Sequence, residues 1–104
     1  MNNNNTNINH ATLNLYNIFL TVAQTMNLSA ASKRLFISQP AISKAIKQLE
    51  NELGTTLFFR NSRGVQLTED GELLYSHIFN AFNEIATGEQ LLNSRKELGI
   101  GRIR

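Results

Sequence analysis

The sequence predicts a mainly α fold, in which a three-helix core and a two-stranded hairpin precede one long C-terminal helix. Three observations predict it. Apolar residues recur at helical spacing over stretches between residues 13 and 53, and two short β-type runs flank a turn sequence at residues 61–64. Residues 69–97 then form one uninterrupted helical pattern. The combination is that of a winged helix-turn-helix with a long linker helix.

Composition limits the class of protein. A chain of 104 residues with 41% hydrophobic residues is one small domain, with or without an extension. The absence of cysteine excludes disulfides and Cys-ligated metal sites. No apolar run approaches the roughly 20 residues that span a bilayer, so we expect a cytoplasmic protein with no membrane partner. Residues 1–12 are rich in Asn, and we expect a disordered tail there.

The first two helices follow from apolar spacing and capping. A first helix is predicted over residues 13–26. Ser29 is a suitable N-cap for a short helix over residues 30–35, which would bury Ala31 and Leu35.

The third helix begins at Ser38-Gln39-Pro40. Ser38 suits the N-cap, and a proline is tolerated in the first turn. Gly54 suits a left-handed C-cap. Apolar residues at i, i+4, i+7 and i+11 predict one buried stripe, formed by Ile42, Ile46, Leu49 and Leu53. The expected core of the domain consists of Phe19, Val22, Leu35, Ile42, Ile46 and Leu49.

The opposite edge of the third helix is polar and basic. Stepping 100° per residue from the buried stripe places Pro40, Lys44 and Lys47 on this edge. Ser43 lies on its flank and Gln39 at its exposed tip. Such a helix can enter the major groove of DNA, which is wide enough to admit it. An ordinary surface helix with solvated lysines is the competing interpretation; the neighbouring elements favour base contacts by Gln39, Pro40, Ser43 and Lys44.

A hairpin follows the third helix. Leu57–Arg60 and Val65–Leu67 are predicted strands, separated by the turn sequence Asn61-Ser62-Arg63-Gly64. Arg60 and Arg63 would lie at or near its tip, where they could reach the minor groove or flanking phosphates. A basic hairpin that is merely solvated is the alternative.

Charge is segregated along the chain, although the net charge is only +2. Residues 33–63 hold six basic and two acidic side chains, whereas residues 69–97 hold six acidic and two basic ones. A phosphate backbone would be attracted to the first zone and repelled by the second. The expected backbone and wing contacts are Ser38, Lys33, Arg34, Lys47, Arg60 and Arg63.

The linker helix is predicted over residues 69–98, with Thr68 as N-cap and Gly99 as a stop. Its 29 residues to Glu97 would span about 43 Å, which is too long for a small domain to cover. Its apolar residues recur at steps of 3 and 4, the spacing of a helix-pairing seam. We expect a homodimer through Leu74, Ile78, Ala81, Phe82, Ile85 and Leu92.

No catalytic set is recognised in the sequence. His10 and His77 have no ligand-type residue at suitable spacing, and no glycine-rich phosphate loop is present. We therefore expect no enzyme, no cofactor and no metal site.

The motifs resemble the N-terminal DNA-binding region of LysR-type transcriptional regulators over residues 13–98. The matching residues include Ala31, Leu35, Ser38-Gln39-Pro40-Ala41-Ile42-Ser43, Leu49-Glu50, Leu53-Gly54, Leu57-Phe58, Arg60, Leu67-Thr68-Glu69 and Gly71. Met26 stands where Gly is usual, Ser32 where Ala is usual, Lys44 where Arg is frequent and Phe59 where Glu is frequent. We expect the first two departures to affect packing.

The resemblance implies a dimer that binds interrupted inverted repeats near promoters. Residues matching Gln39, Pro40, Ser43 and Lys44 meet bases or sugar-phosphate in this family, and those matching Arg60 and Arg63 contact DNA from the wing. Family members continue into an effector-binding domain that senses a small molecule and form higher oligomers at full length. Residues 99–104 would begin the hinge to that domain, so we expect a truncated chain, with an effector only where the domain exists.

Three functions remain open at this point. The first is a sequence-specific DNA-binding module of a transcriptional regulator. The second is a winged-helix protein-interaction module that docks an acidic partner. The third is an enzyme fragment, which the lack of a catalytic cluster disfavours.

Overall fold

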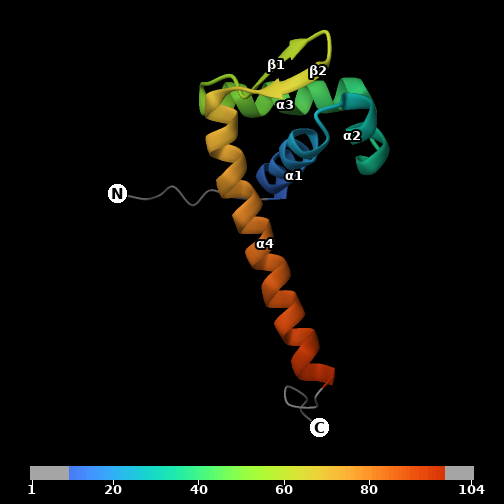
Figure 1. The fold of residues 1–104 in the computed structure, drawn as a ribbon, viewed down its shortest axis with the longest axis vertical. Coiled ribbons are helices and arrows are strands. Elements are labelled where there is room, and N and C mark those ends of the chain that lie inside the picture. Colours follow the sequence, from blue (N-terminus) through green and yellow to red (C-terminus); the bar gives the residue numbers. More distant parts are fainter. Residues whose placement is uncertain (1–9, 98–104) are drawn as a thin grey trace.

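The computed structural model describes residues 10–97, which form four helices and one antiparallel hairpin. The elements in chain order are α1 (His10–Thr25), α2 (Leu28–Leu35), α3 (Gln39–Leu53), β1 (Phe58–Asn61), β2 (Gly64–Leu67) and α4 (Glu69–Glu97). Figure 1 shows α1, α2 and α3 gathered beside the hairpin, while α4 runs away from them as a single rod. The expected tail up to residue 9, the helix stop at Gly99 and the hinge at 99–104 lie outside the described residues.

The helix ends confirm most of the predicted caps and correct two boundaries. Helix α1 begins at His10, three residues before the predicted start, so residues 10–12 of the expected disordered tail are helical. Helix α2 is capped by Asn27, whose Oδ1 accepts the Ala30 N–H at 2.8 Å, so the expectation of a cap at Ser29 was wrong. In α3 the predicted caps are confirmed: Ser38 Oγ accepts the Ala41 N–H at 3.2 Å. Gly54 is left-handed at φ 72°.

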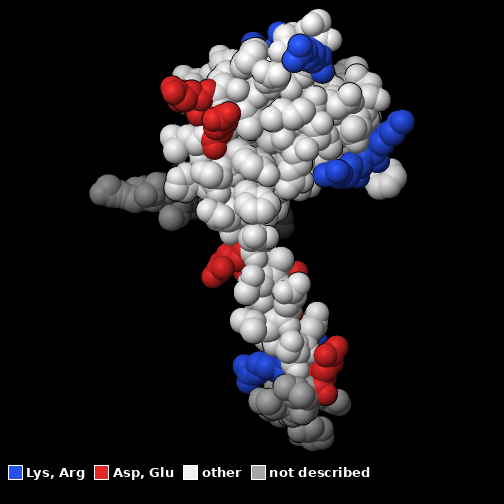
Figure 2. Space-filling view, in the orientation of Figure 1, with Lys and Arg blue, Asp and Glu red and all other residues white. Residues whose placement is uncertain are grey.

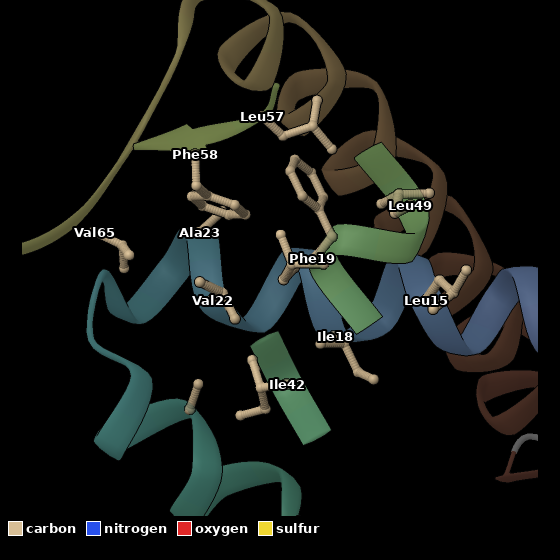
Figure 3. Packing of buried hydrophobic residues seen from close by; sticks show 12 residues of the cluster. Leu15, Ile18, Phe19, Val22, Ala23, Ile42, Leu49, Leu57, Phe58 and Val65 are labelled. Carbon is tan, nitrogen blue, oxygen red and sulfur yellow. The ribbon is translucent and has the colours of Figure 1, made fainter. Parts of the chain in front are cut away.

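The core forms where α1 meets α3 and the hairpin. Its largest fully buried side chains are Phe19, Ile42, Leu49, Leu57 and Val22, most of which Figure 3 shows facing one another. The expected core is confirmed for Phe19, Val22, Ile42, Ile46 and Leu49, whereas Leu35 is only partly buried. Leu53 was wrongly placed in the buried stripe, since it is 43% exposed at the last position of α3.

The hairpin is part of the core and not an appendage to it. Phe58 and Val65 are buried, and the rings of Phe19 and Phe58 are 5.4 Å apart between centroids. Strand partners are Phe58 with Leu67, Phe59 with Gln66 and Arg60 with Val65. Because side chains alternate between faces along a strand and directly paired residues share a face, Arg60 lies on the inner face with Phe58 and Val65.

The start of α4 is fixed tightly to the domain. Thr68 Oγ1 accepts the Gly71 N–H at 3.0 Å, which confirms the predicted cap. A Cβ on Gly71 would lie 2.2 Å from the carbonyl oxygen of Leu57, so only glycine permits this approach. Leu74 and Ile78 pack against the core from the next two turns.

Beyond Ile78 the described part of α4 leaves the rest of the chain (Figure 1). The expected pairing seam therefore needs correction: Leu74 and Ile78 are partly buried within the protomer itself. Phe82 is half-buried, whereas Ala81, Ile85 and Leu92 are exposed, with 57% of Ile85 and 59% of Leu92 accessible. None of the described helices is sufficiently long and apolar to cross a membrane.

Candidate nucleic-acid interface

A groove of about 460 Å³ separates α3 from the hairpin. Its floor is apolar and includes Val22, Ile46, Phe58 and Val65. Its polar lining comes from both elements, namely Ser43, Lys44, Lys47 and Glu50 on α3 and Arg60 on β1. The structure thus brings together four of the predicted contact residues, which are separated by up to 17 positions in sequence: Ser43, Lys44, Lys47 and Arg60.

One hydrogen bond crosses this groove. Arg60 Nη2 donates to Ser43 Oγ at 3.0 Å. Arg60 lies near the hairpin turn, as expected, because its pair with Val65 is next to the last pair of the hairpin, while its guanidinium is directed to α3. Arg63 does lie in the turn, and its N–H donates to Asn61 Oδ1 at 2.8 Å.

The acidic side chain in the groove has structural partners. Glu50 Oε2 accepts the N–H groups of Leu57 and Phe58 at 2.8 and 3.2 Å. The carboxylate thereby joins the last turns of α3 to the start of β1. These backbone partners of Glu50 were not predicted, because nothing in its local sequence pattern indicates partners seven and eight residues away.

A second hollow, of about 270 Å³, adjoins the N-terminal end of α3. Gln39 and Arg60 line it together with Asn27 and Ser29 from the start of α2. The ends of α2 and α3 therefore converge beside the hairpin. Neither Asn27 nor Ser29 was predicted as a contact residue, although two capping-type residues at a helix start are the signal that could have indicated them.

Lys33 and Arg34 lie apart from both hollows, in the last turn of α2. Arg34 Nη1 donates to Gln24 Oε1 of α1 at 3.3 Å. Figure 2 shows basic atoms over the hairpin and over α2, and acidic atoms near the junction of α3 with α4 and along α4, whose last turn also carries the basic Arg95 and Lys96. The segregation of charge along the sequence is thus also a segregation in space.

No candidate metal centre competes with this surface in the described part of the chain. Between residues 10 and 97, no three His, Cys, Asp or Glu side chains gather so that they could hold a metal ion. His77 is exposed on α4.

Comparison with known proteins decides the family. The model of the bacterial regulatory helix-turn-helix proteins of the lysR family matches residues 13–72. The chain belongs to the LysR family. The LysR-type match runs from residue 13 within α1 to the first turn of α4, and therefore includes the groove and the second hollow.

Curated relatives agree with this membership. The chain is 43% identical over 95 residues to the HTH-type transcriptional regulator XapR of Escherichia coli (strain K12), covering 85% of this chain and 32% of XapR. It is 39% identical over 84 residues to AlsR of Bacillus subtilis (strain 168), covering 79% of this chain and 28% of AlsR. The chain thus spans about a third of the length of these relatives.

Solved LysR-type structures share the fold. The BenM DNA-binding domain, crystallised in complex with catB site 1 DNA, superposes with a TM-score of 0.70 at 29% identity. That match covers 86% of this chain and 98% of the domain. CbnR, a LysR family transcriptional regulator, gives a TM-score of 0.66 at 33% identity, with 79% of this chain and 28% of CbnR covered.

The departures from the LysR-type pattern have distinct structural settings. Met26 has a left-handed backbone with φ 54° and a side chain that is 38% exposed, so this departure also concerns the backbone conformation. Its effect on packing stays a prediction. Ser32 Oγ donates to the Ile37 carbonyl at 2.5 Å, across the turn between α2 and α3. Lys44 is exposed beside the groove, and Phe59 is on the outer face of the hairpin.

Proposed function

We propose that this chain is the sequence-specific DNA-binding and dimerisation region of a LysR-type transcriptional regulator. The observation that carries the proposal is the groove between α3 and the hairpin, whose basic side chains come from both elements. A helix with exposed polar and basic residues fits the major groove, while a neighbouring hairpin lies close to the flanking backbone. As a regulator of transcription, the protein would act in the cytoplasm.

Base reading is assigned to the exposed N-terminal half of α3. Gln39 is exposed at the first helical position, and its amide can pair with the N6 and N7 edge of adenine. Lys44 is exposed and reaches guanine acceptors as a point charge, without the bidentate fork of arginine. Pro40 and Ser43 permit close approach to neighbouring bases.

Backbone contacts are assigned to residues around this half of α3. Lys47 follows Lys44 by three positions and lines the same groove, and Arg63 projects from the hairpin turn. Ser38 lies at the N-terminus of α3, where backbone N–H groups favour an anion. Lys33 and Arg34, in the last turn of α2, would contact DNA phosphates farther from the groove.

Dimerisation is assigned to the part of α4 that projects from the domain. Ala81, Phe82, Ile85 and Leu92 lie on its apolar side, and all but the half-buried Phe82 are exposed. Pairing of two such helices about a two-fold axis would cover these side chains. The two α3 helices of the dimer would then face one side of the duplex, related by the two-fold axis. The DNA site that matches this arrangement is an inverted repeat. Binding of a small-molecule effector and assembly into higher oligomers are expected only where an effector-binding domain is present.

Selection of bound sequences from a random duplex pool, followed by titration of the best site at several salt concentrations, tests this function. We expect an enriched inverted repeat and an affinity that falls steeply with salt, because phosphate contacts release counterions. Enrichment of no sequence would defeat the proposal. Salt-sensitive binding to an acidic protein together with no measurable affinity for duplex DNA would favour the protein-interaction module instead.

A further inference from the structure

We propose that Arg60 is a positioning residue for base recognition: its hydrogen bond to Ser43 makes that hydroxyl reject cytosine at one position of the DNA site. This inference rests on the proposed function, because it requires α3 to lie in the major groove.

The geometry that carries it is a contact between two elements. Arg60 Nη2 donates to Ser43 Oγ at 3.0 Å, across 17 positions of sequence. Arg60 pairs with the buried Val65 in the hairpin, so its side chain leaves β1 on the inner face, towards α3. Ser43 is half-buried on the flank of α3, next to the exposed Lys44. The hairpin therefore contacts α3, the helix proposed to read the bases, through a direct hydrogen bond.

The chemistry of the two groups determines which of them donates the hydrogen bond and which accepts it. A guanidinium carries only donors, whereas a serine hydroxyl has one donor and two acceptor lone pairs. Ser43 Oγ must therefore accept from Arg60, and its proton is directed away from the cation. One lone pair remains, but accepting from a cation polarises the O–H group and strengthens it as a donor. The hydroxyl that is presented to DNA therefore favours an acceptor on the base.

A serine held as a donor distinguishes the bases in the major groove. Guanine, adenine and thymine each present at least one acceptor there, whereas cytosine presents only its N4 amino donor. A serine without a partner can serve either kind of base edge. Arg60 thus adds a preference against cytosine without itself touching that base.

A contact of Arg60 with a phosphate is the competing role, and it predicts a different result. Loss of a phosphate contact weakens binding to all sequences alike and reduces the dependence of affinity on salt. Loss of a positioning contact changes which sequence is preferred.

The test is selection from a random duplex pool with the 104-residue chain and five variants. Ser43→Ala identifies the base position that Ser43 reads. Arg60→Ala should reduce the rejection of cytosine at that same position by about fivefold, the value of one typical hydrogen bond. Arg60→Lys keeps a cationic donor and should retain the wild-type preference. Ser43→Ala/Arg60→Ala should show the preference of Ser43→Ala alone, because Arg60 acts through Ser43.

Arg63→Ala is the matched control, since Arg63 lies in the turn of the same hairpin and should leave the preference at the Ser43 position unchanged. Circular dichroism of each variant checks the fold. Uniform loss of affinity in Arg60→Ala with an unchanged preferred sequence would overturn the inference, as would a Ser43→Ala variant that alters no position. A wild-type chain that selects no sequence would defeat the proposed function itself.

Discussion

Met26 holds a conformation that is unfavourable for a residue with a side chain. It follows α1 with φ 54°, and its N–H donates to the Val22 carbonyl at 2.7 Å, which closes the last turn of the helix. In the left-handed region a Cβ approaches the following carbonyl, so glycine is the residue that fits without strain. The usual glycine of LysR-type proteins at this position therefore has a backbone explanation.

Met26→Gly should stabilise the domain by about 1 kcal/mol, because the strain of the left-handed backbone disappears. Denaturant unfolding monitored by circular dichroism measures the change. Gln48→Gly is the control: Gln48 lies inside α3 with ordinary helical geometry, and glycine there should destabilise by roughly 0.5–1 kcal/mol. Equal effects of both substitutions would show that the backbone at Met26 is not strained.

Gln39 is the residue whose role in reading bases is tested most directly. Gln39→Ala should cost about 1–3 kcal/mol on the preferred site and relax the preference at one base position. Competition binding on the preferred duplex and on variants of single base pairs measures both. Gln48→Ala, an amide on the same helix outside both hollows, serves as the control. A loss of equal size on every duplex would remove Gln39 from base recognition.

At the scale of elements, periodicity predicted the helices and the hairpin, and local chemistry predicted the caps at Ser38, Thr68 and Gly54. The cap at Asn27 was missed because Asn27 and Ser29 are both good caps, and only the extended backbone of Asn27, at φ −153°, decides between them. Leu53 continues the stripe of α3 past the point where the core ends.

Contacts between elements were beyond prediction from local patterns. The bond from Arg60 to Ser43 and those from Glu50 to the start of β1 depend on the position of the hairpin over α3. Burial of the inner hairpin face at Phe58 and Val65 depends on the same arrangement. Charge and spacing identified the residues of the groove, whereas their partners required the fold.

We expect one phosphate contact from the hairpin, through Arg63, and one from α3, through Lys47. Arg63→Ala and Lys47→Ala should each weaken binding on most sequences alike and reduce the slope of log affinity against log salt by about 1. Titrations at several salt concentrations give the slope. Arg95→Ala, in the last turn of α4, is the matched control and should leave the slope unchanged. An unchanged slope in both test variants would place these side chains outside the interface.

At the scale of the whole molecule, α4 has two parts with different surroundings. Its first turns pack on the domain through Leu74 and Ile78, and the rest projects with Ile85 and Leu92 exposed. Helical spacing predicted one continuous apolar side, but it contains no information on where the domain stops covering it. A substitution that tests pairing must therefore lie beyond Ile78.

Ile85→Glu should convert a dimer into a monomer, because a charge in the paired seam is costly to bury. The domain should stay folded, since Ile85 is 57% exposed in the protomer. Light scattering should give twice 11.7 kDa for the wild type and 11.7 kDa for the variant. Affinity for an inverted repeat should fall towards that for one half-site, because the second contact is no longer tethered.

Thr87→Glu is the control, because Thr87 is exposed on nearly the opposite side of α4 and should leave the mass at the dimer value. A wild-type mass of one chain would show that the projecting helix does not pair by itself.

The first turn of α4 is packed closely on the domain at Gly71, so the helix and the domain should move together as one rigid unit. From Ile78 to Glu97 its projecting arm is about 28 Å long, so a tilt of roughly 10° moves its far end by about 5 Å. Because a Cβ at Gly71 would lie 2.2 Å from the Leu57 carbonyl, the joint has little room to absorb such a tilt. In a pair of these helices, a small change in crossing angle would therefore be converted into a change in the separation of the two recognition helices. The spacing between half-sites on the DNA would thus be set by an angle far from the DNA.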